Sequence, residues 1–330
     1  MKFKLAIVFS VIATLLIPNG AYPKSDLLIL RVGHFPNITH APALVGRANK
    51  NFETSLKDIA RVEWKLFNAG PEAIEALAVG AIDILYVGPN PAVNGFVRSK
   101  GELLRIVSGV ASAGAAFVVT ENSGIKKFED IRGKRVATPQ IGNTQDVALR
   151  SLMTKNHIKS KTQGGDVEIF NLSGADQLTA FLKNQIDAAW AVEPWVSRLT
   201  SEANGKILFE EKELWENGIY ATTVLVVRKK FLDQNPEVAK KWVREHVEIV
   251  RWIRQNQNEA KQIVNDELKR ETGKGIPEKY LDESFKRIEF TTDPMENSVR
   301  ESANRAFQVG FLGKNPIDLA NLYDKSFLKE

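Results

Sequence analysis

Residues 138–150, TPQIGNTQDVALR, decide the fold of this chain. They follow a short strand-like run at residues 134–137 and pass into a helical pattern. Between the two lie Gly142, Asn143 and Thr144, which favour a tight turn and a helix N-cap. Such a unit leaves several backbone N–H groups unpaired at the positive end of a helix dipole. This stretch therefore predicts an anion-binding turn.

A second unit of the same kind lies 104 residues earlier in the chain. At this offset residues 30–33 align with 134–137, and the segment from Ala69 aligns with the segment from Ser173. Four pairs are identical without a gap: Gly70 and Gly174, Ala76 and Ala180, Ile82 and Ile186, Asp83 and Asp187. A segment between them aligns after a one-residue slip, with Val62 beside Val167. Because solenoid repeats run to about 20–50 residues, this longer period predicts two α/β lobes with one order of strands and helices.

Length and leader fit an exported protein of two lobes. The 330 residues suffice for two lobes, each with its own core. Lys2 and Lys4 precede an apolar run at residues 5–17, which is the pattern of an export signal peptide, and residues 1–24 are assigned to it. The run is short for a membrane span, which needs about 20 residues. An uncleaved N-terminal anchor is the alternative.

The composition excludes several kinds of site. The chain contains no cysteine, which excludes disulfides, thiolate metal sites, cysteine nucleophiles and a lipid-modified cysteine. The formal net charge of +5 falls to +2 without the lysines of residues 1–24. The sequence shows no run of Lys and Arg of the kind that nucleic-acid binding requires, so no nucleic-acid partner is expected.

Two segments are predicted to connect the lobes. Residues 111–116, Ala-Ser-Ala-Gly-Ala-Ala, lie between strand-like runs, and their small side chains allow close approach of backbone or ligand. An ordinary loop is the alternative. Residues 218–227, GIYATTVLVV, are expected to form a strand that returns the chain. Lobe one is then 25–113 plus 221–330, lobe two is 114–220, and the helices after Phe231 are expected to pack on lobe one.

The predicted ligand site lies in a cleft between the lobes, because ligands of open α/β sheets bind beyond the carboxyl ends of the strands. Four turns meet that description: residues 34–40, 88–91, 138–144 and 192–195. Asn143 and Thr144 are candidates for contact with an anion; the alternative is a pair of simple caps, with Asp146 completing a capping box. His40 lies at the equivalent turn, where a protonated ring would favour an anion and a structural hydrogen bond is the alternative.

Trp195 and Glu193 are further candidates. Trp195 can form a wall for an aliphatic tail, and plain packing is the alternative. Glu193 would repel an anion, so that it either binds a ligand's amine or accepts structural hydrogen bonds. The structural role is favoured, because a buried carboxylate needs donors.

The two predicted crossings and the first turn supply the remaining candidates. Tyr220 can donate its hydroxyl into the cleft, and Ser112 lies in the first crossing. Asn37 is a weaker ligand candidate, and Asn37 or Thr39 can instead cap the helix predicted at residues 41–49.

No catalytic motif is recognisable in the sequence. It lacks a nucleophile elbow, a Walker loop and a His/Asp/Glu cluster at metal-ligand spacing. Asp83 and Asp187 align in the repeat, and their place between helix and strand assigns them to turn stabilisation. The sequence favours binding over turnover, with no cofactor and no metal.

Five segments carry a family resemblance: RVGHFPNITHAPAL, EAIEALAVGAIDILYVGPNPAV, GVASAGAAFVV, ATPQIGNTQDVALRSLM and IDAAWAVEPWVSRL. Together they resemble the periplasmic substrate-binding proteins of ABC importers for aliphatic sulfonates, taurine and nitrate, over about residues 27–265. The resemblance implies an α/β, type II-like periplasmic-binding-protein fold with two crossover strands. The resemblance further implies that the turns hold the oxyanion of the ligand. Six residues are candidates for that contact: Asn37, His40, Asn90, Asn143, Thr144 and Trp195.

The resemblance also implies how the protein works. It implies a monomeric receptor, soluble in the periplasm after signal cleavage, that passes its ligand to a membrane permease with a cytoplasmic ATPase. An aliphatic sulfonate is the favoured ligand, and nitrate, bicarbonate and taurine stay open. Closure of the lobes is expected about residues 111–116 and 219–222.

Two other classes of protein share this fold. Pyrimidine-precursor synthases of thiamine biosynthesis are enzymes, some of them iron-dependent, and the missing cysteines and the leader argue against that class. A sensory pair of lobes would need a separate membrane partner to transmit its signal.

Overall fold

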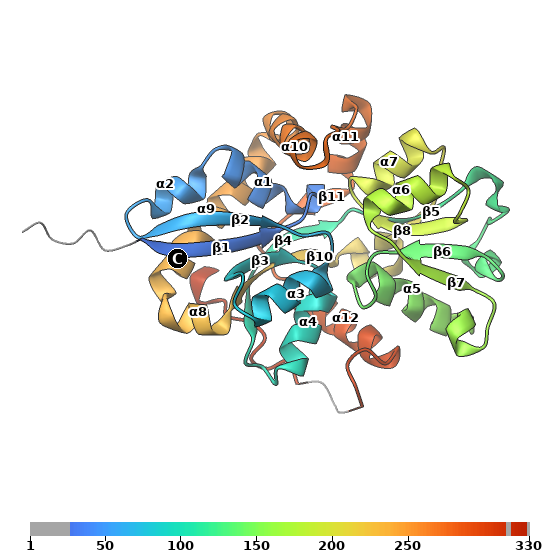
Figure 1. The fold of residues 1–330 in the computed structure, drawn as a ribbon, viewed down its shortest axis with the longest axis horizontal. Coiled ribbons are helices and arrows are strands. Elements are labelled where there is room, and N and C mark those ends of the chain that lie inside the picture. Colours follow the sequence, from blue (N-terminus) through green and yellow to red (C-terminus); the bar gives the residue numbers. More distant parts are fainter. Residues whose placement is uncertain (1–26, 315–317, 329–330) are drawn as a thin grey trace, which may run out of the picture.

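A computed structural model describes residues 27–314 and 318–328. The signal peptide predicted at residues 1–24 lies outside this range. Figure 1 shows two lobes side by side, each built on its own β-sheet. No helix of the described residues is long and apolar enough to cross a membrane.

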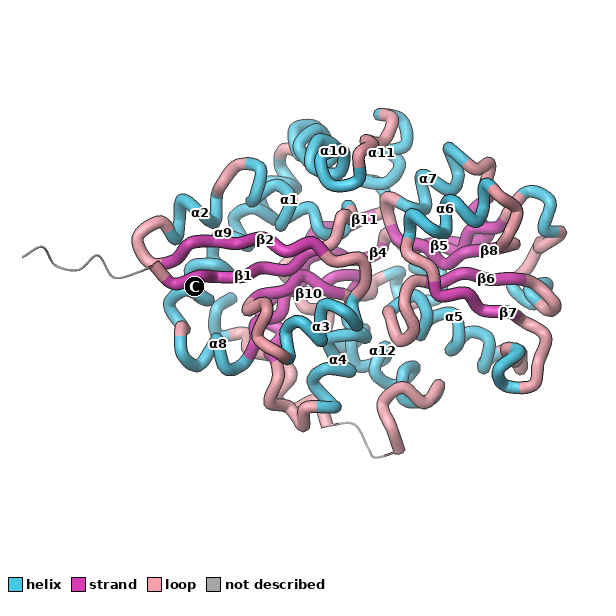
Figure 2. Tube along the Cα trace, in the orientation of Figure 1, coloured by secondary structure: helices cyan, strands magenta, loops and turns pink. Residues whose placement is uncertain are grey.

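The first sheet has the strand order β11-β4-β10-β3-β1-β2. Its strands are β1 (Leu28–His34), β2 (Ala60–Leu66), β3 (Ile84–Val87), β4 (Leu104–Ala113), β10 (Ala221–Arg228) and β11 (Ile288–Phe290). Helices cover both of its faces (Figure 2). They include α1 (Ala41–Ala48), α2 (Asn51–Leu56), α3 (Gly70–Ala78), α4 (Pro89–Arg98), α8 (Lys229–Gln234), α9 (Pro236–Gln255) and α10 (Gln257–Thr272). This sheet and these helices form the first lobe.

The second sheet has the strand order β7-β6-β8-β5-β9. Its strands are β5 (Ala115–Val119), β6 (Arg135–Thr138), β7 (Glu168–Asn171), β8 (Ala188–Val192) and β9 (Lys206–Glu210). Its helices are α5 (Thr144–Lys155), α6 (Gly174–Leu182) and α7 (Trp195–Glu202), and together they form the second lobe.

The internal repeat is confirmed in the strand registers. In the first sheet Val32 pairs with Ile84, and in the second Val136 pairs with Ala188, each 104 residues later. The predicted slip is also present, because Arg31 pairs with Glu63 whereas Arg135 pairs with Glu168. Both sheets thus place three parallel strands in the same order, β2-β1-β3 and β7-β6-β8.

The two aligned aspartates hold equivalent turns. The Asp83 carboxylate accepts a hydrogen bond from Arg31 N (3.2 Å), and the Asp187 carboxylate accepts one from Arg135 N (2.8 Å). Each also pairs with an arginine: Asp83 Oδ1 with Arg228, and Asp187 Oδ1 with Arg135. Their assignment to turn stabilisation is confirmed.

The chain passes between the sheets at two adjacent places. From β4 to β5 it turns at Ala113 and Gly114, which have φ values of 64° and 83°. A side chain at Gly114 would also lie 2.5 Å from Ile288 Cγ1, so glycine is required there both by conformation and by space. The returning strand β10 pairs with β4 at Ala221 and Ser112, so the two crossings lie beside each other.

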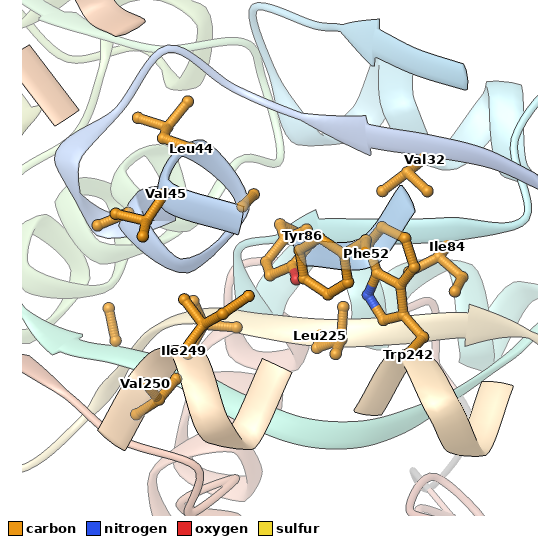
Figure 3. Close-up of a cluster of buried hydrophobic side chains, with 14 of the residues drawn as sticks. Val32, Leu44, Val45, Phe52, Ile84, Tyr86, Leu225, Trp242, Ile249 and Val250 are labelled. Carbon is orange, nitrogen blue, oxygen red and sulfur yellow. The ribbon is translucent and has the colours of Figure 1, made fainter. Parts of the chain in front are cut away.

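The helices after Phe231 form a large part of the first core. Trp242 of α9 stacks on Phe52 of α2, with ring centroids 3.7 Å apart, and Tyr86 and Leu225 of the sheet belong to the same cluster (Figure 3). Burial of each such side chain contributes about 1.5–3 kcal/mol. The prediction that these helices pack on the first lobe is therefore right for α9.

Two later helices also pack on the first lobe, but they contact the second lobe as well. Helix α11 (Glu278–Lys286) packs against β11 and α10 of the first lobe and α7 of the second, and α12 (Glu296–Gln308) packs against α4 of the first lobe and α5 of the second. In Figure 1 they lie between the lobes, on opposite sides of the crossing strands. Their contacts with the second lobe depend on side chains far away in sequence, which the helical periodicity does not reveal.

Candidate ligand-binding site

A cavity of about 40 Å³ lies where the turns of the two lobes meet. Both copies of the repeat contribute to its wall at equivalent positions: Phe35 and Pro139, Thr39 and Asn143, His40 and Thr144, Gly88 and Val192. Because about 10–15 Å³ of such space holds one water molecule, the cavity has room for a small group of atoms. It lies at the carboxyl ends of the parallel strands, where the sequence predicts the ligand site.

Five of the nine predicted ligand residues line this cavity: Asn37, His40, Asn143, Thr144 and Trp195. Contact of these five residues with a ligand stays a prediction. The structure does show that residues more than 150 positions apart share one wall.

Five of the described helices begin at the cavity. His40, Gly88 and Asn143 are the N-cap residues of α1, α4 and α5, and Gly174 and Trp195 are the first residues of α6 and α7. The positive ends of their dipoles converge on the cavity and favour an anion. The predicted turns at residues 88–91 and 192–195 are thus helix starts, the first with Pro89 at N1, where proline is readily accommodated.

Asn143 and Thr144 are not engaged in capping. Asn143 is the N-cap of α5, yet its side chain makes no cap hydrogen bond. Asp146 does not complete a capping box; its carboxylate accepts from Gly142 N (3.0 Å), Thr138 Oγ1 (2.9 Å) and Arg150 Nε (2.9 Å). Asp146 thereby holds the turn in place. The side chains of Asn143 and Thr144 are not needed for that purpose and can face the cavity. The predicted caps Asn37 and Thr39 are wrong as well, since His40 is the N-cap of α1.

The Thr144 hydroxyl is buried and has no hydrogen-bond partner among the described residues. Such a group is costly unless a ligand or water satisfies it. We therefore expect Thr144→Val, which keeps the shape and removes the hydroxyl, to weaken anion binding about tenfold. Isothermal titration measures the loss. Thr154→Val, on the exposed side of the same helix, is the control; equal losses in both variants would assign Thr144 to the helix rather than to the ligand.

His40 lines the cavity, and its surroundings favour the neutral form of the ring. Burial lowers the pKa of His40 well below its usual range, and nearby His34 adds to the shift. Its Nδ1 accepts a hydrogen bond from Phe35 N (3.3 Å), so the ring hydrogen resides on Nε2. Neutral His40 can still donate that hydrogen to an anion.

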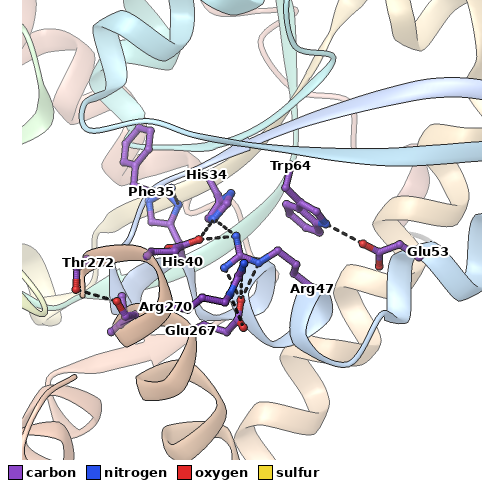
Figure 4. A network of polar contacts seen from close by, with 11 residues as sticks. His34, Phe35, His40, Arg47, Glu53, Trp64, Glu267, Arg270 and Thr272 are labelled. Atoms are coloured by element: carbon purple, nitrogen blue, oxygen red, sulfur yellow. Dashed lines mark hydrogen bonds and ion pairs between the residues drawn. The ribbon is translucent and has the colours of Figure 1, made fainter. Parts of the chain in front are cut away.

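A polar network behind His40 fixes the first turn (Figure 4). His34 Nε2 lies 2.7 Å from Glu271 Oε1, and Arg47 of α1 pairs with Glu267 and Glu271 of α10. These contacts tie the end of β1 and helix α1 to α10. His34 is thus a structural residue outside the cavity wall.

Trp195 lies against the start of α6. A side chain at Gly174 would come within 2.4 Å of the Trp195 ring, so the indole packs directly on the glycine backbone. The Arg198 guanidinium lies over the ring, 5.2 Å from its centroid. Trp195 begins helix α7 rather than lying on a free turn, and it forms an apolar part of the cavity wall.

Glu193 is turned away from the cavity and belongs to a hydrogen-bond network. It is fully buried; its carboxylate accepts from Ser197 N (3.1 Å), Ser284 Oγ (3.0 Å) and Arg287 Nη1 (3.0 Å). Burial raises the pKa of Glu193, and Arg287 and Ser197 oppose the shift. These contacts are those of the structural role that the sequence favours for Glu193.

Three other candidates also lie outside the cavity wall. Asn90 Nδ2 donates to the Ser302 carbonyl (3.0 Å) and joins α4 to α12. Ser112 Oγ accepts from Tyr220 N (3.3 Å), which joins the two crossing strands. The Tyr220 ring stacks on Trp215, with centroids 5.2 Å apart. These contacts hold elements together, and a ligand role for the three residues stays a prediction.

The sequence reasoning missed several polar residues of the wall: Asn68, Gln145, Gln177, Thr222 and Thr223. Thr222 is the last residue of the predicted hinge segment 219–222. The sequence thus predicted the crossing strand, but it did not predict that this strand contributes to the cavity wall. Gln177 had a usable signal, because it lies on the face of α6 that buries Ala180 and Phe181. A polar residue on the apolar face of a helix is an indication of a site.

The cavity wall carries no Lys, Arg, Asp or Glu among the residues that the structure describes. Its polarity comes from amides, hydroxyls, one neutral histidine and helix dipoles. No group of three or more His, Asp or Glu that could hold a metal ion occurs within the described ranges.

Comparison with known proteins places the chain in a family. The sequence profile of the NMT1-like family matches residues 24–265. The taurine-binding periplasmic protein of Escherichia coli (strain K12) is 31% identical over 229 residues, which cover 67% of this chain and 68% of that protein. A Bacillus subtilis (strain 168) protein, provisionally named an aliphatic sulfonates-binding protein, is 25% identical over 94% of this chain and 91% of that protein.

A solved structure confirms the fold class. The alkanesulfonate-binding protein of Xanthomonas axonopodis pv. citri, bound to MOPS, superimposes with a TM-score of 0.75 at 17% identity, and the match covers 92% of this chain and 100% of that one. At that identity the likeness concerns the fold alone. Together with the profile match and the taurine-binding relative, it shows that this chain belongs to the NMT1-like family, with the two-lobe fold of periplasmic binding proteins.

Proposed function

We propose that this protein is an exported solute-binding receptor of an ABC importer, which captures a small organic anion, an aliphatic sulfonate, between its lobes. The observation that carries the proposal is the cavity at which five helices begin and whose described wall has no charged side chain. A sulfonate is ionised at physiological pH, so neutral donors and helix dipoles can bind it without a compensating cation.

Contacts between the lobes support binding by closure. Ile38 N of the first lobe donates to the Glu193 carbonyl of the second (3.2 Å). Glu72 N donates to Gln140 Oε1 across the same gap (3.2 Å). Since the two crossings are short and adjacent, rotation about them would separate these pairs and open the cavity.

A taurine receptor is the second candidate, because the relative of 31% identity carries that name. Within the described wall no carboxylate is present to meet the ammonium group of taurine, since Glu193 is held by Ser197, Ser284 and Arg287. Nitrate and bicarbonate receptors remain alternatives of the same class. An enzyme of the thiamine-pyrimidine-synthase kind is the alternative of another class, and product formation from a bound ligand would identify it.

The proposed function is tested by thermal unfolding of the leaderless protein with a panel of anions. The panel holds ethane- to octanesulfonate, taurine, nitrate, bicarbonate, sulfate and phosphate. A ligand that binds only the folded protein raises the unfolding midpoint, by an amount that corresponds to about 2.7 kcal/mol at one hundred times its Kd. We expect the rise with short alkanesulfonates. A rise confined to nitrate or bicarbonate, or none with any anion, would contradict the sulfonate assignment.

The partners follow from the same proposal. The protein is exported to the periplasm, acts as a monomer and delivers its ligand to a membrane permease driven by a cytoplasmic ATPase. Co-purification of the leaderless protein with such a permease, dependent on ligand, would support this assignment.

A further inference from the structure

We propose that Gln177 makes the site selective for organic anions that carry a hydrogen-bond donor beside the anionic head. The inference rests on the proposed function, because it concerns which anion the same cavity prefers. Gln177 lies in the first turn of α6 (Gly174–Leu182), is 1% exposed and belongs to the cavity wall.

The orientation of the Gln177 amide is determined by its surroundings. Its Nε2 donates to the Leu172 carbonyl at 3.0 Å. A carbonyl oxygen can only accept, so exchange of the amide N and O would place two acceptors together. Gln177 Oε1 therefore faces away from Leu172, and it has no hydrogen-bond partner among the described residues.

A buried acceptor without a partner is costly, and a sulfonate cannot satisfy it, because all oxygens of a sulfonate are acceptors too. The hydroxyls of Thr144 and Thr223, which are also unpartnered within the described chain, can rotate to donate to an anion. Gln177 Oε1 cannot. A ligand satisfies this oxygen only if it brings a donor, such as a hydroxyl or an ammonium group.

The two halves of the repeat differ at this position. Gln177 aligns with Ala73, which is buried in the apolar core of the first lobe. The acceptor is thus present on the second lobe alone, whereas helix starts come from both lobes. The donor group of the ligand is expected to face α6, with the anionic head toward the N-termini of the other helices.

Three ligands of one skeleton test the inference: ethanesulfonate, which has no donor, isethionate, which adds a hydroxyl, and taurine, which adds an ammonium group. Isothermal titration gives the Kd of each. For the native protein we expect isethionate, taurine or both to bind at least about tenfold more tightly than ethanesulfonate. Tighter binding of isethionate would identify a neutral donor. Tighter binding of taurine alone would identify a cationic donor. Either result supports the inference.

Gln177→Met keeps the volume and removes the acceptor. We expect it to bring the three Kd values within about twofold of one another while ethanesulfonate still binds. Gln185→Met, at an exposed residue beyond α6, is the matched control. Equal binding of all three ligands by the native protein, or unchanged discrimination in Gln177→Met, would overturn the inference and leave the proposed function standing. Failure of every ligand here and in the anion panel would overturn both.

Discussion

Replacing Arg287 by methionine is expected to lower the free energy of unfolding by about 3 kcal/mol. The Arg287 guanidinium pairs with Glu193 (3.0 Å) and Glu210 (3.2 Å). The Glu193 side chain is fully buried, so the substitution leaves a buried carboxylate without its cation. Breaking a buried ion pair lowers the free energy of unfolding by about 3–5 kcal/mol. We expect the lower value because Ser197 and Ser284 still donate hydrogen bonds to Glu193.

The pH dependence distinguishes this explanation from simple loss of packing. Burial raises the pKa of Glu193 in the folded protein, so the folded state binds the proton more tightly than the unfolded state. Ionised Glu193 therefore destabilises the folded protein fully when the pH is above its pKa in the folded state. This destabilisation disappears as the pH falls below its pKa in the unfolded state. In Arg287→Met the destabilisation is therefore expected to shrink as the pH falls toward the ordinary range of a glutamate pKa.

Denaturant titration at several pH values measures both effects. Arg251→Met is the control, because the Arg251–Glu248 pair is exposed and contributes less than about 1 kcal/mol. Two outcomes would contradict this explanation. The destabilisation in Arg287→Met could be no larger than in the control, or it could grow as the pH falls. Either would show that Arg287 does not stabilise the fold by pairing with the buried carboxylate.

The Gly88→Ala variant is expected to bind the anion up to about 100-fold more weakly while its lobes stay folded. A side chain at Gly88 would lie 2.4 Å from Thr144 Oγ1 of the opposite lobe, far inside normal contact. The backbone of Gly88 has a φ of −65°, which alanine adopts without strain. The added methyl group therefore acts between the lobes and keeps them from closing on the ligand.

Small-angle X-ray scattering at saturating ligand tests this effect. The native protein is expected to become more compact, and Gly88→Ala is expected to keep the dimensions of its unliganded form. Combining Gly88→Ala with Thr144→Ala removes the clashing oxygen and should restore compaction, although the ligand loses one donor. Full compaction in Gly88→Ala alone would mean that the glycine is not needed for closure.

Sequence reasoning was most accurate where the physical cause is local or repeated. The offset of 104 residues predicted two lobes, and it reappears in the registers of Val32 with Ile84 and of Val136 with Ala188. Those pairs lie in short apolar strands that are mostly buried on both faces, and each segment carries its own bounding turns. The Asn143–Thr144 turn was located for the same reason, since a strand end and a helix start are neighbours in sequence.

The sequence left open the roles of side chains whose partners are distant. Glu193 is neutralised by Arg287, 94 residues later, and Asn90 donates to Ser302, 212 residues later. No pattern near Glu193 or Asn90 indicates those partners. The neutral state of His40 has the same origin, because it results from burial that only the assembled lobes create.

By itself, the sequence determined the two-lobe architecture, the crossings, and the turns at which an anion is expected to bind, because each rests on neighbouring residues or on their repetition. Only the tertiary structure decided which side chains of those turns face the cavity. Asn143, Thr144 and Gln177 line it, whereas Glu193 and Tyr220 do not. The physical reason is that a buried polar group turns toward whichever donor or acceptor the fold places nearby, and that choice exists only once distant segments have packed together.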